Sequence, residues 1–409
     1  MVHATGAWNY SEGMRAAIDR RAMGMLSGGH CAVDFASGAV PAMLPFLKEE
    51  FRLGYAATAA IMLAATISSS LVQPAFGLLS DRRGAMWLLP VGVLVAGVGI
   101  ACAGLSPAYP LVLVSVFIAG FGIAAFHPEG AKFASYASGR KRASGMALFN
   151  FGGNSGYALG PILITPLVGW LSLRGAADAT QPLFVVAGLL TFGLRRLGTL
   201  HPQARGVRPT VAEDQPRAMA LLLGVILMRS FTWFGLITFV PLWVISLGHT
   251  KAEGNRMLFL MLVTGAFGAL AVGPIADRVG LRRTLFVSTA ALPLLVLTFI
   301  HVGGVVGGAA LMLVGVCIVG TFGVVMVLSQ SYLPQHVALA SGLNVGLAVG
   351  LGGVCAVLVG AVADAIDLQT ALTICALTPI VAACLTLLLP APPSLRPATG
   401  GLVTESAGA

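Results

Sequence analysis

Long apolar runs recur along the whole chain, and each is close to the length of a helix that crosses a membrane. A spanning helix needs about 20 predominantly apolar residues. Only 10% of the residues are charged, compared with about 25% in an ordinary soluble domain. We therefore expect an all-α membrane protein with twelve transmembrane helices, and not a soluble enzyme. The predicted spans lie near residues 22–47, 55–79, 86–105, 109–135, 143–171, 181–198, 218–247, 255–276, 284–302, 306–330, 340–363 and 369–390.

A polar stretch divides these runs into two groups of six. Residues 199–217 contain several prolines and charges, which is typical of a linker. We expect two six-helix bundles on either side of it, formed by residues 22–198 and 218–390. Residues 1–21 are expected to form a short cytoplasmic lead-in. Residues 391–409 are rich in Pro, Gly and Ala, and are expected to form a disordered cytoplasmic tail.

Most of the 24 Lys and Arg residues fall in segments that would lie on one side of the membrane. Cytoplasmic loops of membrane proteins collect Lys and Arg, so this bias predicts that both termini are cytoplasmic. The same bias explains the formal net charge of +9 without a nucleic-acid partner. The expected partners are a small-molecule substrate and the lipid bilayer, and the expected oligomeric state is a monomer.

The six cysteines all fall in apolar runs and include no CxxC pair. We interpret them as small buried apolar residues, and not as disulfides or metal ligands. No metal and no cofactor is expected, apart from the proton as a coupling ion.

A short motif occurs once in each half of the chain, at matching positions. Residues 77–84 (GLLSDRRG) follow the second predicted span, and residues 273–280 (GPIADRVG) follow the eighth. Such repeats are typical of transporters whose two pseudo-twofold-related halves enclose a binding site. We predict that conformational gating depends on Gly77, Asp81, Arg82 and Gly84 in the first copy, and on Asp277, Arg278 and Gly280 in the second.

Ionisable residues lie within the predicted first and fourth spans. Charge at membrane depth is costly, and therefore marks a candidate functional residue. His30 and Asp34 are four residues apart and share one helix face, while His127 and Glu129 interrupt the fourth span. We predict that Asp34, Glu129, His30 and His127 take part in proton coupling. The alternative is that they form structural ion pairs, such as Glu129 with Lys132.

Arg229 lies near the middle of the seventh span, at a position equivalent to that of Asp34 in the first. A guanidinium at this depth needs an anion or a water-filled cavity. We expect Arg229 and Asp34 to attract each other across a central cavity, with Arg229 released to an anionic substrate when Asp34 is protonated. A purely structural ion pair is the alternative.

The predicted substrate-binding residues are polar or aromatic side chains within the spans. Hydrogen bonding between helices would also explain the asparagines, and contact with lipid would also explain the aromatic residues. The set consists of Arg229, Asn150, Asn154, Phe231, Trp233 and Tyr157.

The repeated motif resembles the signature loop of the major facilitator superfamily. The resemblance implies that the loop Asp lies at the N-terminus of a helix in the opposite half, where a carboxylate is favoured. Asp81 would then face the start of the eleventh span, and Asp277 the start of the fifth. The first copy is followed by residues 85–86 (AM), where the second has the basic residues 282–283 (RR). We therefore expect the contact that holds the two halves together to be weaker at the first copy.

Within that superfamily, the chain resembles the fosmidomycin-resistance efflux family, which implies proton-coupled export across a bacterial inner membrane. The sequence GYALGP also resembles the helix-five motif of proton-driven drug antiporters, so Gly156, Gly160 and Pro161 are expected to take part in gating. The first resemblance is carried by residues 126–129 (FHPE), 150–154 (NFGGN), 160–161 (GP), 330–334 (QSYLP), 341–342 (SG) and the His30/Asp34 pair.

These observations favour a secondary active transporter that exports a small organic compound, including anionic or phosphonate-like drugs, by proton antiport and alternating access. The alternatives are a proton-coupled importer or exporter of an endogenous small anion or metabolite, and a non-transporting sensor on the same fold. The sequence contains no GxSxG, HExxH or GxxxxGK[ST] motif. Enzymatic activity, catalytic residues and ATP-driven transport are therefore not expected.

Overall fold

The structure is a computed structural model that describes residues 17–83, 85–139, 141–200 and 213–391. These ranges are helical and contain no β-strand. The first half contains α1 (Arg20–Glu50), α2 (Tyr55–Arg83), α3 (Leu88–Leu105), α4 (Tyr109–Ala137), α5 (Arg142–Leu171), η1 (Ser172–Arg174), α6 (Gly175–Ala179) and α7 (Gln181–Leu197). The second half contains α8 (Pro216–Ser246), α9 (Lys251–Val279), α10 (Leu281–His301), α11 (Gly304–Val319), α12 (Phe322–Tyr332), α13 (Val337–Ala365) and α14 (Leu368–Leu388).

The helices match the twelve predicted spans. Eleven apolar helical stretches are long enough to cross a membrane, and one of them, Ser144–Leu197, includes both α5 and α7. Each predicted run corresponds to one long helix, except that the tenth is divided into α11 and α12 around Gly320 and Thr321. The expectation of an all-α membrane protein with twelve transmembrane helices is confirmed.

Several helices extend beyond the apolar runs because capping groups set their ends. α1 begins before the predicted run, since the Asp19 side chain accepts a hydrogen bond from the backbone N–H of Ala22 (3.1 Å). α9 begins directly after Thr250, which forms a capping box with Glu253. Hydropathy finds the part of a helix that lies in lipid, whereas the caps decide where the helix starts.

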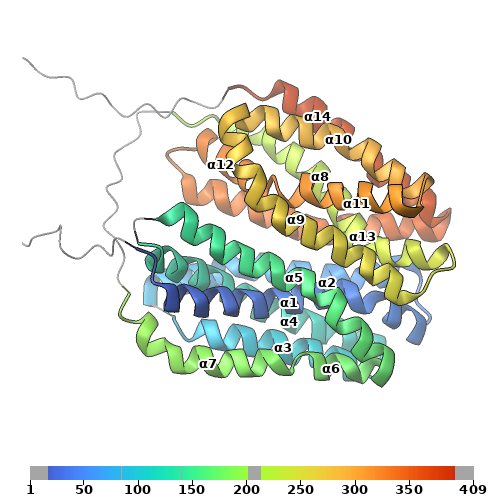
Figure 1. Cartoon of the computed structure of the whole chain (residues 1–409), viewed down its shortest axis with the longest axis horizontal. Helices are drawn as coiled ribbons and strands as arrows, with labels where there is room; N and C mark the ends of the chain where they lie inside the picture. Colours follow the sequence, from blue (N-terminus) through green and yellow to red (C-terminus); the bar gives the residue numbers. More distant parts are fainter. Residues whose placement is uncertain (1–16, 84, 140, 201–212, 392–409) are drawn as a thin grey trace, which may run out of the picture.

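The helices form two six-span bundles that follow the chain order (Figure 1). In the first bundle α1 packs most extensively on α5, and α3 on α4. In the second, α9 packs on α11 and α8 on α14. The bundles meet mainly through α2 with α13, and through α5 with α9. Sequence-distant helices of the two halves therefore form the boundary between the bundles.

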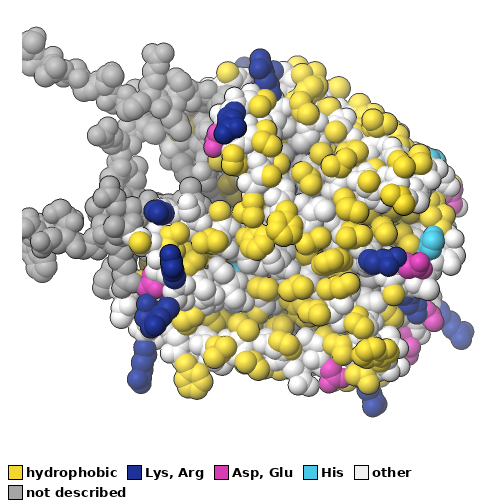
Figure 2. Space-filling model, in the orientation of Figure 1, with side chains coloured by type: hydrophobic (Ala, Val, Ile, Leu, Met, Phe, Trp, Pro, Cys, Tyr) yellow, Lys and Arg dark blue, Asp and Glu magenta, His cyan; other side chains and the backbone are white. Residues whose placement is uncertain are grey.

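The two ends of the molecule differ, and we name them by what they carry. The terminus end holds the start of α1 and the end of α14, and the opposite end holds the end of α1 and the start of α9 (Figure 1). Figure 2 shows that hydrophobic side chains cover the middle of the visible face, while charged side chains gather towards its two ends. This distribution matches a molecule whose helix axes run across a bilayer.

Glycines allow α1 and α5 to pack with their backbones in contact. A side chain at Gly156 would overlap the backbone carbonyl oxygen of Cys31, and one at Gly160 would overlap the backbone of Gly38. Such close approach through small residues is a common way for membrane helices to associate. Both glycines thus pack two helices of the same bundle. Pro161 beside them is buried, and a role of these residues in gating stays a prediction.

The end of the predicted linker is anchored to the second bundle. Residues 201–212 lie outside the described residues, as do residues 392–409 of the predicted tail. The backbone N–H of Gln215 donates to the carbonyl oxygen of Tyr332 (2.7 Å), and Asp214 accepts from the backbone N–H of Gln335 (2.9 Å) and pairs with His336. Although desolvation opposes the charged form, these hydrogen bonds hold the pKa of the Asp214 carboxyl below its ordinary value.

The contact between α1 and α5 predicts a stability difference between two glycine substitutions. Gly156→Ala should lower the stability of the folded protein by about 1–3 kcal/mol, because the new methyl group meets a backbone atom that can move only with its helix. Gly28→Ala is the matched control on α1, since no heavy atom lies within 4 Å of its added carbon. Reversible unfolding in detergent measures both variants. Equal stability of the two would contradict the close packing described above.

Candidate functional site

A cluster of three ionisable side chains lies at mid-depth in the first bundle. Asp34 on α1 contacts His30 on the same helix (Oδ2 to Nε2, 3.2 Å) and His127 on α4 (Oδ1 to Nε2, 3.3 Å). The side chain of His30 is 8% exposed, that of Asp34 17% and that of His127 26%. The structure therefore brings three of the four predicted proton-coupling residues together, and leaves the cluster partly open on the side of His127.

The hydrogen bonds of the two imidazoles determine where their protons must be. His30 Nδ1 lies 2.8 Å from the carbonyl oxygen of Phe149, and His127 Nδ1 lies 2.8 Å from that of Ile123. A carbonyl oxygen only accepts, so each Nδ1 donates, and each Nε2 of a neutral imidazole then presents a lone pair to the Asp34 carboxylate. Each of the two contacts with Asp34 is favourable only if a proton lies between nitrogen and oxygen. The geometry thus leaves a position for a proton between each Nε2 and the Asp34 carboxylate.

Aromatic rings and a glycine form the walls of this cluster. The His30 ring stacks on Phe149, with ring centroids 4.1 Å apart. A side chain at Gly153 on α5 would come within 2.5 Å of the His30 ring and 2.7 Å of an Asp34 oxygen. Sequence reasoning did not assign Gly153 to the site, although the signal was present in the glycine pair between Asn150 and Asn154.

Among the described residues, these three side chains are the one group of His, Cys, Asp or Glu residues that could bind a metal ion together. Their ligand atoms lie within 4.8 Å of one another. A metal ion and the protons would compete for the same lone pairs, so experiments on proton exchange need a chelator.

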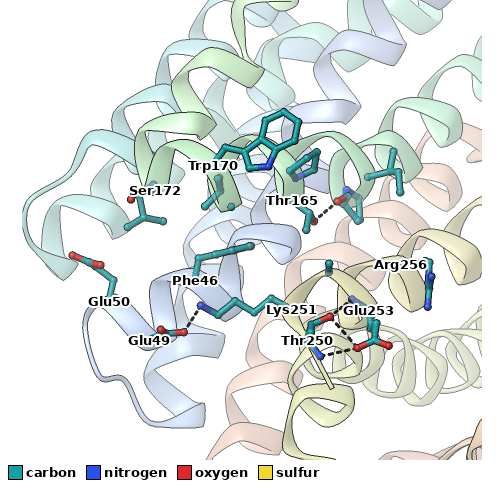
Figure 3. Close-up of a pocket in the computed structure, with 17 residues that line it drawn as sticks. Phe46, Glu49, Glu50, Thr165, Trp170, Ser172, Thr250, Lys251, Glu253 and Arg256 are labelled. Carbon is teal, nitrogen blue, oxygen red and sulfur yellow. Dashed lines mark hydrogen bonds and ion pairs between the residues drawn. The ribbon is translucent and has the colours of Figure 1, made fainter. Parts of the chain in front are cut away.

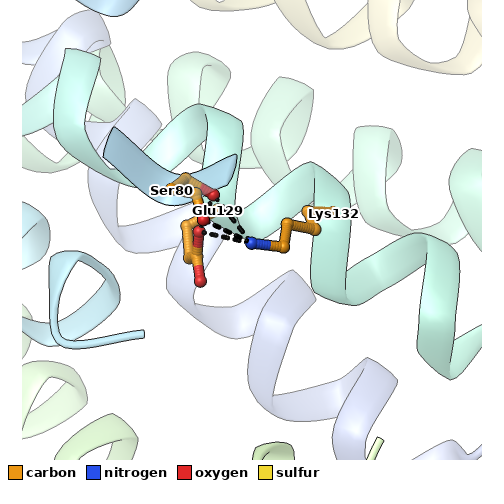
Figure 4. Close-up of polar contacts among 3 residues, drawn as sticks. All are labelled: Ser80, Glu129 and Lys132. Carbon is orange, nitrogen blue, oxygen red and sulfur yellow. Dashed lines mark hydrogen bonds and ion pairs between the residues drawn. The ribbon is translucent and has the colours of Figure 1, made fainter. Parts of the chain in front are cut away.

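Glu129 belongs to a separate contact, which it forms with Ser80 and Lys132 (Figure 4). Its side chain is fully buried, and its Oε2 contacts the hydroxyl of Ser80 and the ammonium of Lys132 (3.4 Å). Lys132 also donates to the carbonyl oxygen of Ser80 (2.9 Å), so the contact ties α4 to the end of α2. The other carboxylate oxygen, Oε1, has no hydrogen-bond partner among the described residues. This arrangement favours the ion-pair interpretation of Glu129.

Arg229 does not meet Asp34, so the predicted pairing of these two residues is wrong in this structure. Its guanidinium is buried within the second bundle, where it donates to the hydroxyls of Thr289 (2.5 Å) and Thr321 (2.6 Å). It also donates to the carbonyl oxygen of Cys317 (3.0 Å), at the end of α11. The break between α11 and α12 frees carbonyl groups, and a cation is favoured at such a C-terminal helix end. The broken helix supplies the negative partner that we expected from a carboxylate.

The other predicted substrate-binding residues lie on α5 and α8 and do not form one described contact group. Asn150 on α5 is exposed and Asn154 is partly buried, and neither amide hydrogen-bonds to a described residue. Tyr157 on α5, and Phe231 and Trp233 on α8, are partly buried and pack against the hydrophobic core. The two asparagines thus keep free donors and acceptors, whereas the aromatic residues contribute packing.

The described residues of the repeated motif lie at the terminus end, where α2 and α9 end. Asp277 and Arg278 are exposed, and Asp277 makes no hydrogen bond or ion pair with a described residue, so the expected contact with the start of α5 is absent. Gly280 ends α9 with φ 101°, a conformation that favours glycine. Gly77 lies beside Pro128, whose Cβ would be 3.9 Å from a side-chain carbon added at Gly77. The side chains of Asp81 and Arg82, and all of Gly84, lie outside the described residues.

At the opposite end, polar contacts join the two bundles. The Asp364 carboxylate on α13 accepts hydrogen bonds from the backbone N–H groups of Tyr55 (2.7 Å) and Ala56 (2.9 Å), so it caps α2 from the other bundle. Sequence reasoning missed this role. A signal was available, because α2 follows Leu53 and Gly54 and has no capping side chain of its own.

Two further contacts close the same end. The Asn255 side-chain amide on α9 donates to the carbonyl oxygen of Ala42 on α1 (2.9 Å) and to the hydroxyl of Thr165 on α5 (2.8 Å). Lys251 on α9 pairs with Glu49 on α1 (Figure 3). Together with the Asp364 cap, these hydrogen bonds and this ion pair hold the two bundles together at the opposite end.

The environment of Arg229 predicts which residues are energetically coupled to it. In a double-mutant cycle, Arg229→Gln and Thr289→Val should show a coupling of about 0.6 kcal/mol or more, which is typical of side-chain hydrogen bonds between membrane helices. The cycle of Arg229→Gln with Asp34→Asn should be additive, because the two groups have separate partners. Reversible unfolding in mixed detergent measures both cycles. Coupling of Arg229 to Asp34, together with additivity with Thr289, would instead support the ion pair of Arg229 with Asp34 that the sequence suggested.

Comparisons with known proteins agree with this architecture. Residues 26–356 match the Major Facilitator Superfamily. The chain is 30% identical to the uncharacterized MFS-type transporter YfnC of Bacillus subtilis and 26% identical to the fosmidomycin resistance protein of Escherichia coli, in each case over 90% of this chain and 92% of the relative.

Solved structures show the same fold. A bacterial homologue of the human lysosomal transporter Spinster, in an inward-facing and occupied conformation, superposes with a TM-score of 0.72 at 14% identity, covering 90% of this chain and 96% of that one. A mutant of the nucleoside transporter NupG gives 0.70 at 13% identity, covering 90% and 99%. The chain therefore belongs to the Major Facilitator Superfamily, and is a multi-pass membrane protein of the secondary transporter class and not an enzyme.

Proposed function

We propose that this protein exports a small organic compound in exchange for protons, and that anionic and phosphonate-like compounds are among its substrates. The proposal places it in a bacterial inner membrane with both termini in the cytoplasm, as the distribution of Lys and Arg favours. The name of the fosmidomycin resistance relative supports the export of a phosphonate-like drug. An importer of an endogenous metabolite is the alternative, supported by similarity to the proline/betaine transporter of Escherichia coli, 23% identical over 67% of this chain.

The cluster of Asp34, His30 and His127 is the observation that carries proton coupling. Each imidazole donates its Nδ1–H to a backbone carbonyl oxygen. A further proton must therefore bind between an Nε2 and the Asp34 carboxylate. When both contacts hold a proton, the Nε2 lone pairs and the facing carboxylate oxygens are occupied. When protons leave, the same atoms can accept hydrogen bonds from a polar group of the substrate. Proton and substrate thereby compete for the same atoms, as exchange requires.

Alternating access is supported by the unequal closure of the two ends. Asp364, Asn255 and Lys251 close the opposite end, whereas Asp277 at the terminus end has no described polar partner. In the proposed orientation, this state opens towards the cytoplasm. To open outwards, the bundles must break the contacts of Asp364 and bring Asp277 towards the start of α5. A carboxylate at a helix N-terminus thus stabilises each closed end in turn.

Two carboxylate substitutions distinguish the possible proton sites. Asp34→Asn should abolish the proton release that accompanies substrate entry, because the amide, unlike the carboxylate, cannot accept a proton from either imidazole. Glu129→Gln should retain this release and its pH dependence, since Glu129 lies in a separate contact with Lys132. The measurement is substrate-induced pH change in proteoliposomes containing a chelator, with fosmidomycin and a panel of small organic anions.

The outcomes separate the alternatives. Unaltered proton release by Asp34→Asn would exclude the cluster. If Glu129→Gln instead flattened the pH dependence between about pH 6 and 8, Glu129 would be the coupling residue, because a pH profile reports the groups that the process requires. Substrate movement without any proton movement in the unsubstituted protein would overturn the proposed coupling.

The cap that Asp364 provides predicts a shift in conformation. Asp364→Asn should favour opening of the opposite end by about 2- to 30-fold, the range expected when a charge at a helix N-terminus is lost. Asp367→Asn is the matched control, because Asp367 caps its own helix α14 through the backbone N–H of Thr370 (2.8 Å). Distances between spin labels at positions 52 and 249, one on each bundle, measure the two populations. A distribution that Asp364→Asn leaves unchanged, or that Asp367→Asn changes equally, would refute this role.

A further inference from the structure

We propose that His30, Asp34 and His127 together bind a divalent transition-metal ion, for which Zn²⁺ is the best match. One ligand atom from each of the three side chains lies within 4.8 Å of the other two. The sequence did not predict this site, because His127 lies on α4, far along the chain from the pair on α1. The proposed transport requires only protons at these atoms, so metal binding is a further property of the cluster.

The spacing of the ligand atoms fits a small metal ion. Asp34 Oδ2 lies 3.2 Å from His30 Nε2, and Asp34 Oδ1 lies 3.3 Å from His127 Nε2. Zinc binds imidazole nitrogen and carboxylate oxygen at about 2.0–2.2 Å, so two of its tetrahedral ligands lie about 3.3–3.5 Å apart. Each contact thus has nearly the length of one edge of a zinc site. The carboxylate binds the ion through both oxygens, or through one oxygen after it turns.

The outer partners of the two imidazoles are also those of a metal site. His30 Nδ1 donates to the carbonyl oxygen of Phe149, and His127 Nδ1 donates to that of Ile123, each at 2.8 Å. A metal-binding His almost always donates its second ring N–H to a carbonyl or carboxylate oxygen, which fixes the ring and the tautomer. Both Nε2 lone pairs then face the carboxylate of Asp34. A cation among these atoms satisfies three acceptors at once.

The chemistry of the ligands selects the class of metal. Two imidazole nitrogens and one carboxylate suit zinc and its neighbours in the first transition row, whereas Mg²⁺ and Ca²⁺ prefer oxygen ligands alone. The side chains of Asp34 and His127 are partly exposed, so a fourth coordination position is open on that side of the cluster. Three protein ligands with one open position are typical of zinc sites that exchange a ligand.

Gly153 on α5 lies directly against two of the proposed ligands. A side-chain carbon added there would lie 2.5 Å from His30 Nε2 and 2.7 Å from Asp34 Oδ2. Glycine is therefore the residue that leaves room for both ligand atoms in their present positions. Gly153→Ala should displace these atoms without removing any ligand.

A bound ion has a consequence for transport. It occupies the Nε2 lone pairs and the carboxylate oxygens between which a proton would bind. Zn²⁺ should therefore inhibit proton-coupled transport by competing with the proton. This consequence rests on the proposed function, whereas metal binding itself does not.

Binding is tested on the purified full-length protein, after removal of any affinity tag and treatment with a chelator. Competition with a zinc-sensitive fluorescent dye measures the affinity, and we expect one Zn²⁺ per chain. Asp34→Asn and His127→Gln should each weaken binding at least about 100-fold, since the loss of an outer partner alone typically costs 10–100-fold. Gly153→Ala should weaken it as well. His336→Gln is the matched control, because His336 pairs with Asp214 outside the cluster.

X-ray absorption at the zinc edge of the unsubstituted protein identifies the ligands without relying on any variant. Imidazole and oxygen ligands are expected, and sulfur ligands would assign the ion to a cysteine and overturn the proposal. Unchanged affinity in an Asp34→Asn/His127→Gln double variant would place the ion elsewhere. An equal loss in His336→Gln, or equal affinity for Mg²⁺, would show an adventitious ion only. A protein that binds zinc here but moves no protons would overturn the proposed function and leave this site standing.

Discussion

A charged side chain in the middle of a membrane protein must find an opposite charge, a dipole or water, and this requirement shapes the interior of both bundles. The structure meets it in three ways. Asp34 is held between two imidazoles, Glu129 contacts Lys132 and Ser80, and Arg229 lies at the end of a broken helix. The first two solutions use groups that can gain or lose protons. The third uses backbone carbonyls and threonine hydroxyls, so it needs no ionisable partner.

The agreement between sequence and structure follows from the range of the forces involved. Twelve spans were predictable because each depends on about 20 consecutive apolar residues. The contact of His30 with Asp34 was predictable as well, since four residues bring two side chains to one helix face. The partners of Arg229 were not, because Thr289 and Thr321 are distant in the chain and the break around Gly320 leaves no strong signal in an apolar run. Symmetry suggested a carboxylate partner, whereas a helix end fills that place.

Helix N-termini provide the same kind of partner to carboxylates at the boundary of the bundles. At the opposite end, Asp364 of the second bundle caps α2 of the first. The repeated motif implies an equivalent contact at the terminus end, and Asp277 has no described partner while the opposite end is closed. In the proposed transport cycle, the two closures would therefore draw on one type of interaction. Because each is worth only about 0.3–2 kcal/mol, substrate and protons can shift the balance between them.

α1 is the element through which a change of protonation can reach this closure. Asp34 lies on α1, and eight residues further along the same helix the carbonyl oxygen of Ala42 accepts the amide of Asn255 from the other bundle. At 1.5 Å per residue the two points are about 12 Å apart. Gly153, Gly156 and Gly160 allow α1 to lie directly against α5. In the proposed coupling, loss of protons at Asp34 would alter the forces on α1 from His127 of α4, and any shift of α1 that follows would act on the hydrogen bond to Asn255.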